Sequence, residues 1–335
     1  MIPDALRKSL NPLSNPKFKE IIFGDRNAKS FKQLQNYFTL QPVAGYIGWL
    51  GHQNFGDEIL YIAFKKLFPE LQVLMYTDCQ NLAPHRSIDP IELILYRNII
   101  KRKKFYDFVF LGGGTLINRQ LYLDWFNHAL ETGHQGIVFG TGVCEPSFWA
   151  EQCPDINYTQ MMADWVAVLK KASYISVRGS RSAMILESHG ISQPKVIGDP
   201  ALSVCTPRTP NTPRNRRLAI NLGSHGSIWG NQEKINEVIA QLVSYFLKKG
   251  WQVEFLPMHP IDFKIGLELM REFNLSEVSI WQNFQTIEKT INHIHNYDIV
   301  VGQRLHSVVI ACGSGVPAIA LSFSDPLTGI SNYSS

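Results

Sequence analysis

An arginine and a histidine at the start of a predicted helix form the strongest candidate site for chemistry in this sequence. The apolar run 298–301 predicts a buried strand, Gly302 gives a turn, and the helix that follows opens with Arg304 and His306. A helix N-terminus carries unpaired N–H groups and favours an anion, while arginine adds a charged fork that matches phosphate or carboxylate. Histidine is suited to proton transfer near neutral pH. The pattern indicates a site that holds a small phosphorylated acid, although a surface arginine and a core histidine in an ordinary βα unit fit the same residues.

A glycine loop follows the first predicted strand. Gly48, Gly51 and Gly56 stand in the spacing GxxGxxG, where they allow tight turns and close approach of a ligand, and Asp57 is placed to cap the next helix. A dinucleotide site would read GxGxxG, so NAD is poorly supported. A βα turn without a ligand is the alternative interpretation.

A second glycine run, Gly112 to Gly114, comes at the end of another predicted strand and directly before Thr115. Its three glycines open space above the sheet, where ligands bind in α/β folds. No Gly-Lys-Ser/Thr follows, so the run is not an ATP-binding loop. Three weaker candidates are Arg178, Asp199 and His225. A solvated arginine is the alternative for Arg178, helix capping or domain docking is the alternative for Asp199, and His225 is a third candidate acid or base. The glycines of this run are Gly112, Gly113 and Gly114.

Short apolar runs alternate with amphipathic segments almost from end to end, which predicts βαβ units and mostly parallel sheets. The fold class is therefore α/β. The predicted strands are 43–49, 73–76, 105–111, 136–140, 174–177, 195–197, 218–221, 253–257, 298–301 and 318–321. The predicted helices between them include 58–68, 160–171, 181–189, 231–249 and 261–273.

The segment 206–216 contains three prolines and predicts a linker. It divides the chain into an N-terminal Rossmann-like domain, 1–205, and a C-terminal one, 217–335. Two such domains are expected to face each other across a cleft and to bind ligand there, outside the carboxyl ends of their strands.

Composition limits the classes of function. The chain has 335 residues, 45% hydrophobic and 18% charged, with a net charge of +4, so it is long enough for two domains and shows no basic face for nucleic acid. Its five cysteines are scattered without a CxxC pair, so neither zinc nor disulfides are indicated. The N-terminus lacks the apolar core of a signal peptide, and we expect a soluble, cytoplasmic protein. The basic run 101–104 is interpreted either as the solvated end of a helix or as a segment that binds peripherally to the anionic inner surface of the membrane.

Six sequence blocks stand in a fixed order along the chain: the loop 48–57, the glycine run 111–116, Ser-Val-Arg at 176–178, Asp-Pro-Ala-Leu at 199–202, Arg-Leu-His at 304–306 and the run 315–322. In this order they resemble the polysaccharide pyruvyltransferase family. The resemblance covers nearly the whole chain. It implies a GT-B-like arrangement and transfer of a pyruvyl group from phosphoenolpyruvate to two hydroxyls of a sugar or lipid-linked oligosaccharide, as a ketal, without cofactor or metal.

The resemblance also implies roles for particular residues. Arg304, with Gly302, Leu305 and Ser307, would bind the donor, and His306 and His259 would act in catalysis. The two glycine loops of the first domain would bind the acceptor. Their residues are Gly48, Gly51, Asn54, Gly56, Asp57, Gly112, Gly113, Gly114 and Thr115.

Two departures from the family pattern stand near the end of the chain. Leu327 occupies a position where family members often carry lysine, a plausible phosphate ligand, and the chain ends at Ser335 where they usually continue with a further helix. Reduced activity, a shifted substrate or truncation would each produce this pattern. A nucleotide-sugar glycosyltransferase and a non-catalytic relative in polysaccharide biosynthesis therefore stay open as alternatives, and a dehydrogenase is the least favoured. The acceptor sugar and the oligomeric state cannot be read from these residues.

Overall fold

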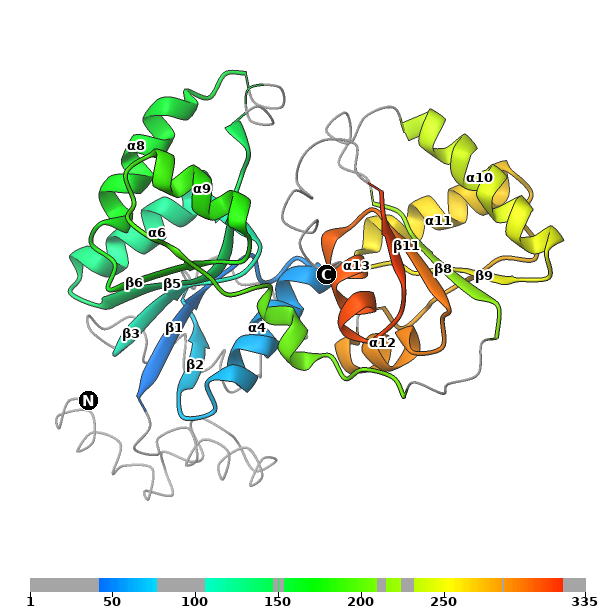
Figure 1. Ribbon diagram of the computed structural model, residues 1–335, viewed down its shortest axis with the longest axis horizontal. Helices are drawn as coiled ribbons and strands as arrows, with labels where there is room; N and C mark the ends of the chain where they lie inside the picture. Colours follow the sequence, from blue (N-terminus) through cyan, green and yellow to red (C-terminus); the bar gives the residue numbers. More distant parts are fainter. Residues whose placement is uncertain are drawn as a thin grey trace, which may run out of the picture.

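A computed structural model describes residues 42–76, 106–146, 150, 154–209, 215–223, 232–284 and 286–321. Within these ranges the chain forms two lobes, each built on its own sheet (Figure 1). The strands of the first sheet end at Val196 and those of the second begin at Arg217, an interval that contains the predicted linker.

The first sheet has the strand order β2-β1-β3-β5-β6-β7, with β4 paired to β5, and every described pair is parallel. Its strands are apolar and largely buried, as expected for a sheet covered on both faces. They are β1 (Val43–Ile47), β2 (Gln72–Met75), β3 (Phe108–Leu111), β4 (Thr115–Ile117), β5 (Gln135–Val143), β6 (Tyr174–Val177) and β7 (Lys195–Val196).

The second sheet has the order β10-β9-β8-β11-β12 and is also parallel throughout the described pairs. Strand order reverses between β8 and β11, because the chain builds outward from β8 to β10 on one side and from β11 to β12 on the other. Such a switch point is where open α/β sheets bind ligands. The strands are β8 (Arg217–Asn221), β9 (Gln252–Phe255), β10 (Ser279–Ile280), β11 (Ile299–Gly302) and β12 (Ala318–Ala320).

Helices cover both faces of each sheet. In the first lobe α6 (Gln120–Glu131), α8 (Tyr158–Leu169) and α9 (Ser180–Ser188) pack on one face (Figure 1). In the second lobe α10 (Gln232–Lys248) and α11 (Pro260–Glu272) pack on one face, and α12 (Ile287–Ile294) and α13 (Leu305–Gly313) on the other.

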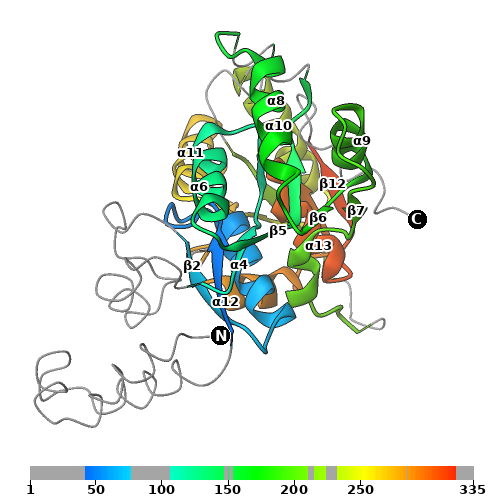
Figure 2. The same cartoon turned by 90° about the vertical axis from the view of Figure 1, so that its left-hand side faces the viewer.

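Helix α4 (Phe55–Leu67) is shared by the two lobes. Its Tyr61 and Phe64 pack with strands of the first sheet, whereas Phe55, Ile59 and Leu60 pack in the core of the second lobe, around α12 and α13. The short 3₁₀ helix η5 (Pro200–Val204) lies against both α4 and α13. In the two perpendicular views α4 lies at the junction beside α13 (Figure 1, Figure 2). The lobes are therefore joined by a packed core as well as by the chain.

The predicted α/β class with mostly parallel sheets is confirmed. All ten predicted strands are present, with ends that differ by a few residues, whereas the three-residue β4, the two-residue β10, α6 and α12 were not predicted. Among the described residues no helix is long and apolar enough to cross a membrane.

Candidate functional site

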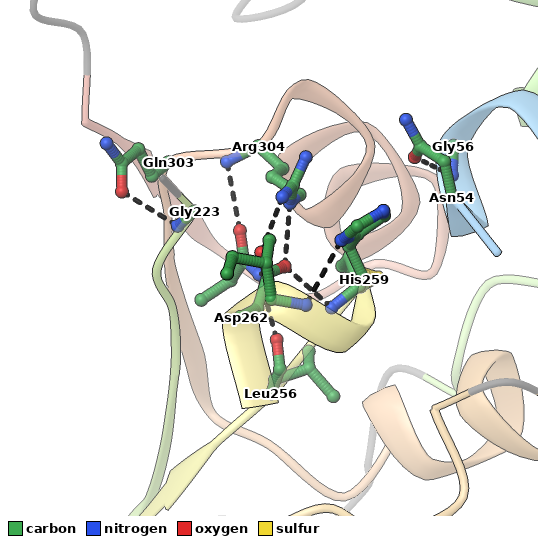
Figure 3. Close-up of polar contacts among 11 residues, drawn as sticks. Asn54, Gly56, Gly223, Leu256, His259, Asp262, Gln303 and Arg304 are labelled. Carbon is green, nitrogen blue, oxygen red and sulfur yellow. Dashed lines mark hydrogen bonds and ion pairs between the residues drawn. The ribbon is translucent and has the colours of Figure 1, made fainter. Parts of the chain in front are cut away.

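The site lies where both sheets turn their carboxyl ends toward the start of α4. The amide of Phe55 donates a hydrogen bond to the Met258 carbonyl, 2.9 Å away, and so ties the first turn of α4 to the loop after β9. Figure 3 shows Asn54 and Gly56 of this turn beside His259 and Arg304 of the second lobe. Residues from the two lobes therefore build one site.

Arg304 is held rigidly at the switch point of the second sheet. Its backbone N–H donates to Asn221 Oδ1 at 2.9 Å, and its Nε and Nη2 donate to the two Asp262 carboxylate oxygens at 2.6 and 2.5 Å (Figure 3). Asp262 is 3% exposed and also accepts a hydrogen bond from the Met258 amide. One edge of the guanidinium is thus occupied, and no described residue pairs with Nη1, so the other edge is the one that can receive an anion.

Arg304 is the N-cap residue of α13, and no side chain caps this helix. The amide of Ser307 donates to the Arg304 carbonyl at 3.1 Å, whereas those of Leu305 and His306 keep their capacity for an anion. Ser307, in contrast, is fully buried and donates its hydroxyl to the Arg304 carbonyl at 2.6 Å. A Cβ on Gly302 would lie 2.1 Å from that hydroxyl, so these two predicted donor ligands pack against each other. Leu305 packs in the core shared with α4.

His306 projects from α13 onto the first lobe and is 8% exposed. Its Nε2 lies 3.6 Å from Asp199 Oδ2, the distance of an ion pair and too long for a hydrogen bond. On the other side Nδ1 abuts Gly56, where an added Cβ would lie only 2.3 Å away. Gly56 is therefore glycine because the imidazole occupies the space of its side chain.

Asp199 connects His306 with Arg178. Its Oδ1 accepts the Ala201 amide at 2.9 Å and so caps η5, while Oδ2 lies 3.8 Å from Arg178 Nη1. Arg178 also donates to the Thr115 hydroxyl at 2.7 Å. Burial alone would raise the pKa of Asp199, but the nearby His306 and Arg178 more than offset it, so this pKa lies below its usual range. The predicted candidates Arg178, Asp199 and Thr115 thus stand in one chain of contacts that ends at His306.

Asp57 is the second buried carboxylate of the first lobe at this junction, 8% exposed. A Cβ on Gly114 would lie 2.9 Å from its Oδ1, so the glycine run makes room for this carboxylate. Burial raises the pKa of Asp57 to about 6, against lowering effects of His306, Arg119, Arg178 and Arg304. The sequence predicted Asp57 as the helix cap, which is wrong: Asn54 caps α4, accepting the Gly56 amide at 3.0 Å, because Asp57 lies inside the first turn.

Two of the predicted acceptor glycines enclose a tyrosine ring. A Cβ on either Gly48 or Gly112 would lie 2.5 Å from the Tyr46 ring, which is 1% exposed. Gly113 and Gly51 have φ of +85° and +105°, a region that favours glycine. Packing and backbone geometry therefore account for these four glycines, and their contact with an acceptor stays a prediction.

His259 caps α11, because its Nδ1 accepts the Ile261 amide at 3.1 Å. Burial and the nearby Arg304 lower its pKa. A ring nitrogen that accepts a backbone hydrogen bond cannot carry a proton, so His259 is held neutral and offers only Nε2–H as a donor. Because Nδ1 is engaged by the backbone and the pKa is lowered, little protonated His259 is present to donate a proton.

Three sequence-based candidates, His225, the basic run 101–104 and Leu327, lie outside the described residues. Within the described ranges no group of three or more His, Cys, Asp or Glu could hold a metal ion. Sequence reasoning missed Asp262 and Asn221, which fix Arg304 from 42 and 83 positions away in the chain. The only local signal for Asp262 was its place in the first turn of a helix that begins with proline.

The comparisons with known proteins fit this geometry. A sequence profile of the family described as polysaccharide pyruvyl transferase matches residues 54–325, and the chain belongs to this family. No curated protein sequence matches the chain.

Solved structures show the fold. A Listeria monocytogenes protein assigned as a UDP-N-acetylglucosamine 2-epimerase superposes with a TM-score of 0.52 at 12% identity, over 85% of this chain and 80% of that one. MnaA from S. aureus, solved with UDP, gives 0.51 at 11% identity, over 80% and 75%. The predicted GT-B-like arrangement of two Rossmann-like sheets is confirmed.

Proposed function

We propose that this protein transfers a pyruvyl group from phosphoenolpyruvate to two hydroxyls of a sugar in a polysaccharide precursor, forming a ketal and releasing phosphate. The observation that carries the proposal is the free edge of the Arg304 guanidinium at the uncapped start of α13, with His306 in the first turn of the same helix. Membership of the polysaccharide pyruvyl transferase family supports the reaction class.

The charges around the site suit a donor with a phosphate and a carboxylate. The carboxylate of Asp262 offsets the charge of Arg304, so Arg304 acts chiefly as an oriented hydrogen-bond donor through Nη1. The start of α13 adds N–H groups, and Arg178 adds a second cation from the first lobe. A donor held between these groups lies against both lobes, beside His306.

The chemistry follows from that position. Protonation of the donor methylene carbon by His306 produces an oxocarbenium-like centre on the neighbouring carbon. A sugar hydroxyl attacks this centre, and a second hydroxyl then displaces phosphate to close the ketal. Positioned acid–base catalysis contributes about 10²- to 10⁴-fold to such a reaction, and orientation and charge stabilisation contribute most of the remainder. Asp199 assists by facing Nε2 of the imidazole from 3.6 Å, where its carboxylate helps to orient the ring.

The test is calorimetric titration of the purified protein with phosphoenolpyruvate, beside UDP-glucose and NADH. Selective binding of phosphoenolpyruvate supports the proposal, and Arg304→Lys should weaken that binding because a single ammonium group cannot reproduce the planar contact. A response to UDP-glucose alone would assign the protein to nucleotide-sugar transfer. The absence of binding to all three compounds would favour a non-catalytic relative.

A further inference from the structure

Asp57 is a buried carboxylate whose surroundings are not explained by contacts within the protein. The other two buried carboxylates of the site have cationic partners: Asp262 is paired with Arg304, and Asp199 faces His306 and Arg178. Among the described residues, none donates a hydrogen bond to Asp57 or forms an ion pair with it, although it is 8% exposed. Buried charges are normally paired or hydrogen-bonded. A carboxylate left without a partner at a ligand site points to a group on the ligand.

The position of Asp57 is set by two close approaches. On one side Gly114 leaves room for its Oδ1, and on the other its neighbour Gly56 lies against Nδ1 of His306. The charged groups that act on Asp57 come from each surrounding element: His306 in α13, Arg119 before α6, Arg178 after β6 and Arg304 before α13. Asp57 thus lies on the first-lobe side of the site, within the electrostatic influence of His306 and Arg304.

We propose, on the basis of the pyruvyl transfer proposed above, that Asp57 is a second catalytic residue, which exchanges protons with the substrates in alternation with His306. In the first step the π electrons of the donor double bond take a proton from His306. The first sugar hydroxyl bonds to the adjacent carbon, and its proton passes to Asp57.

In the second step the bond from that carbon to the phosphate oxygen breaks. Phosphate leaves with the proton held by Asp57, the second hydroxyl bonds to the carbon, and the proton of that hydroxyl passes to His306. Both residues return to their starting state, and no proton is gained or lost overall.

The environment of Asp57 suits both halves of this cycle. A group that gives and takes a proton in one turnover works best with a pKa near the working pH, and burial brings the pKa of Asp57 to about 6. Other side chains of the site are less suited. Both carboxylate oxygens of Asp262 accept hydrogen bonds from Arg304. His306 and Arg178 lower the pKa of Asp199 despite its burial, and His259 Nδ1 is occupied by the Ile261 amide.

Asp57→Asn tests this assignment first without an acceptor. Phosphoenolpyruvate is titrated calorimetrically at pH 7.5–8.5, where the phosphate is fully ionised, in buffers that differ in ionisation enthalpy. If Asp57 lies beside the donor, the anion raises its pKa further, and the unmodified protein takes up a fraction of a proton on binding while most of Asp57 stays ionised and able to accept a proton. Asp57→Asn should lower this uptake and bind at least about tenfold more tightly, because the repulsion is gone. Asp164→Asn, the same change on the exposed face of α8, is the control.

Turnover is then measured as phosphate release with a panel of pyranosides that carry free diols. We expect Asp57→Asn to lower kcat by about 10²- to 10⁴-fold while KM for phosphoenolpyruvate does not rise. Unchanged donor affinity and proton uptake, or turnover at the rate of the unmodified protein, would show that the Asp57 assignment is wrong. Failure of the unmodified protein to bind phosphoenolpyruvate would instead overturn the proposed function itself.

Discussion

Replacing Gly56 with alanine tests how strongly the reaction depends on the position of the His306 ring, because the added Cβ displaces that ring and leaves Arg304 in place. In a helix, alanine is favoured over glycine by roughly 0.5–1 kcal/mol, so the change should not weaken α4 by itself. The new Cβ would lie 2.3 Å from His306 Nδ1, whereas ordinary contacts begin at 3.4 Å, so the imidazole must retreat by about 1.1 Å (3.4 − 2.3). The retreat is opposed on the far side, where Nε2 faces Asp199.

A displacement of about 1 Å in a catalytic group costs on the order of 10²-fold in rate, or about 2.7 kcal/mol of activation free energy. We therefore expect Gly56→Ala to lower kcat by about two orders of magnitude while phosphoenolpyruvate binds within a few-fold of its normal affinity, because Arg304 is untouched. Phosphate release and calorimetry measure the two quantities. The control is Gly266→Ala in α11, which places a Cβ 2.9 Å from Cδ1 at the far end of the Ile280 side chain in β10. A Gly56→Ala protein with a normal melting temperature and kcat within threefold of the original would refute the reasoning.

Three further predictions concern stability. Arg304→Ala should destabilise the fold by about 3–5 kcal/mol because it leaves Asp262 buried without its cation. Adding Asp262→Ala should recover part of the melting temperature but none of the donor affinity. An Arg304→Ala protein as stable as the original would contradict this prediction. Asp57 has a folded-state pKa raised from 3.8 to about 6, so its ionisation lowers the stability of the fold as pH rises through this window. In denaturant titrations Asp57→Asn should therefore be more stable than the unmodified protein by about 3 kcal/mol at pH 8 and no more stable than it at pH 4. Gly112→Ala should cost about 1–3 kcal/mol through overpacking against Tyr46, and Tyr46→Leu in the same protein should restore part of the loss; an additive loss in the double variant would argue against the ring as its cause.

Local patterns were enough to predict most strands, since a parallel strand with both faces covered is a short continuous apolar run. The elements missed by sequence reasoning were short or weakly patterned: β4 has three residues and directly follows the glycine run. Its existence depends on pairing with β5, which no local signal reveals.

The candidate site was predictable in its parts but not in its assembly. Arg304 and His306 were found because they follow a strand at a helix start, which a sequence displays directly. The contacts of His306 with Gly56 and Asp199 join residues that are 250 and 107 positions apart, so the sequence does not indicate that the glycine serves the imidazole. Asp57 was misread as a cap because the same residue types occupy N-cap and first-turn positions, and only the backbone shows which position it occupies.

The sharing of α4 between the two lobes limits how the halves of this chain can be recombined with those of a relative. A chimera that joins the N-terminal half of this chain to the C-terminal half of a relative would bring Phe55, Ile59 and Leu60 into a foreign core. Mismatched volumes in a close-packed interior cost several kcal/mol. A swap of halves therefore requires that these three side chains be matched to the incoming half. The useful boundary for engineering passes along one face of α4 and does not coincide with the proline-rich linker.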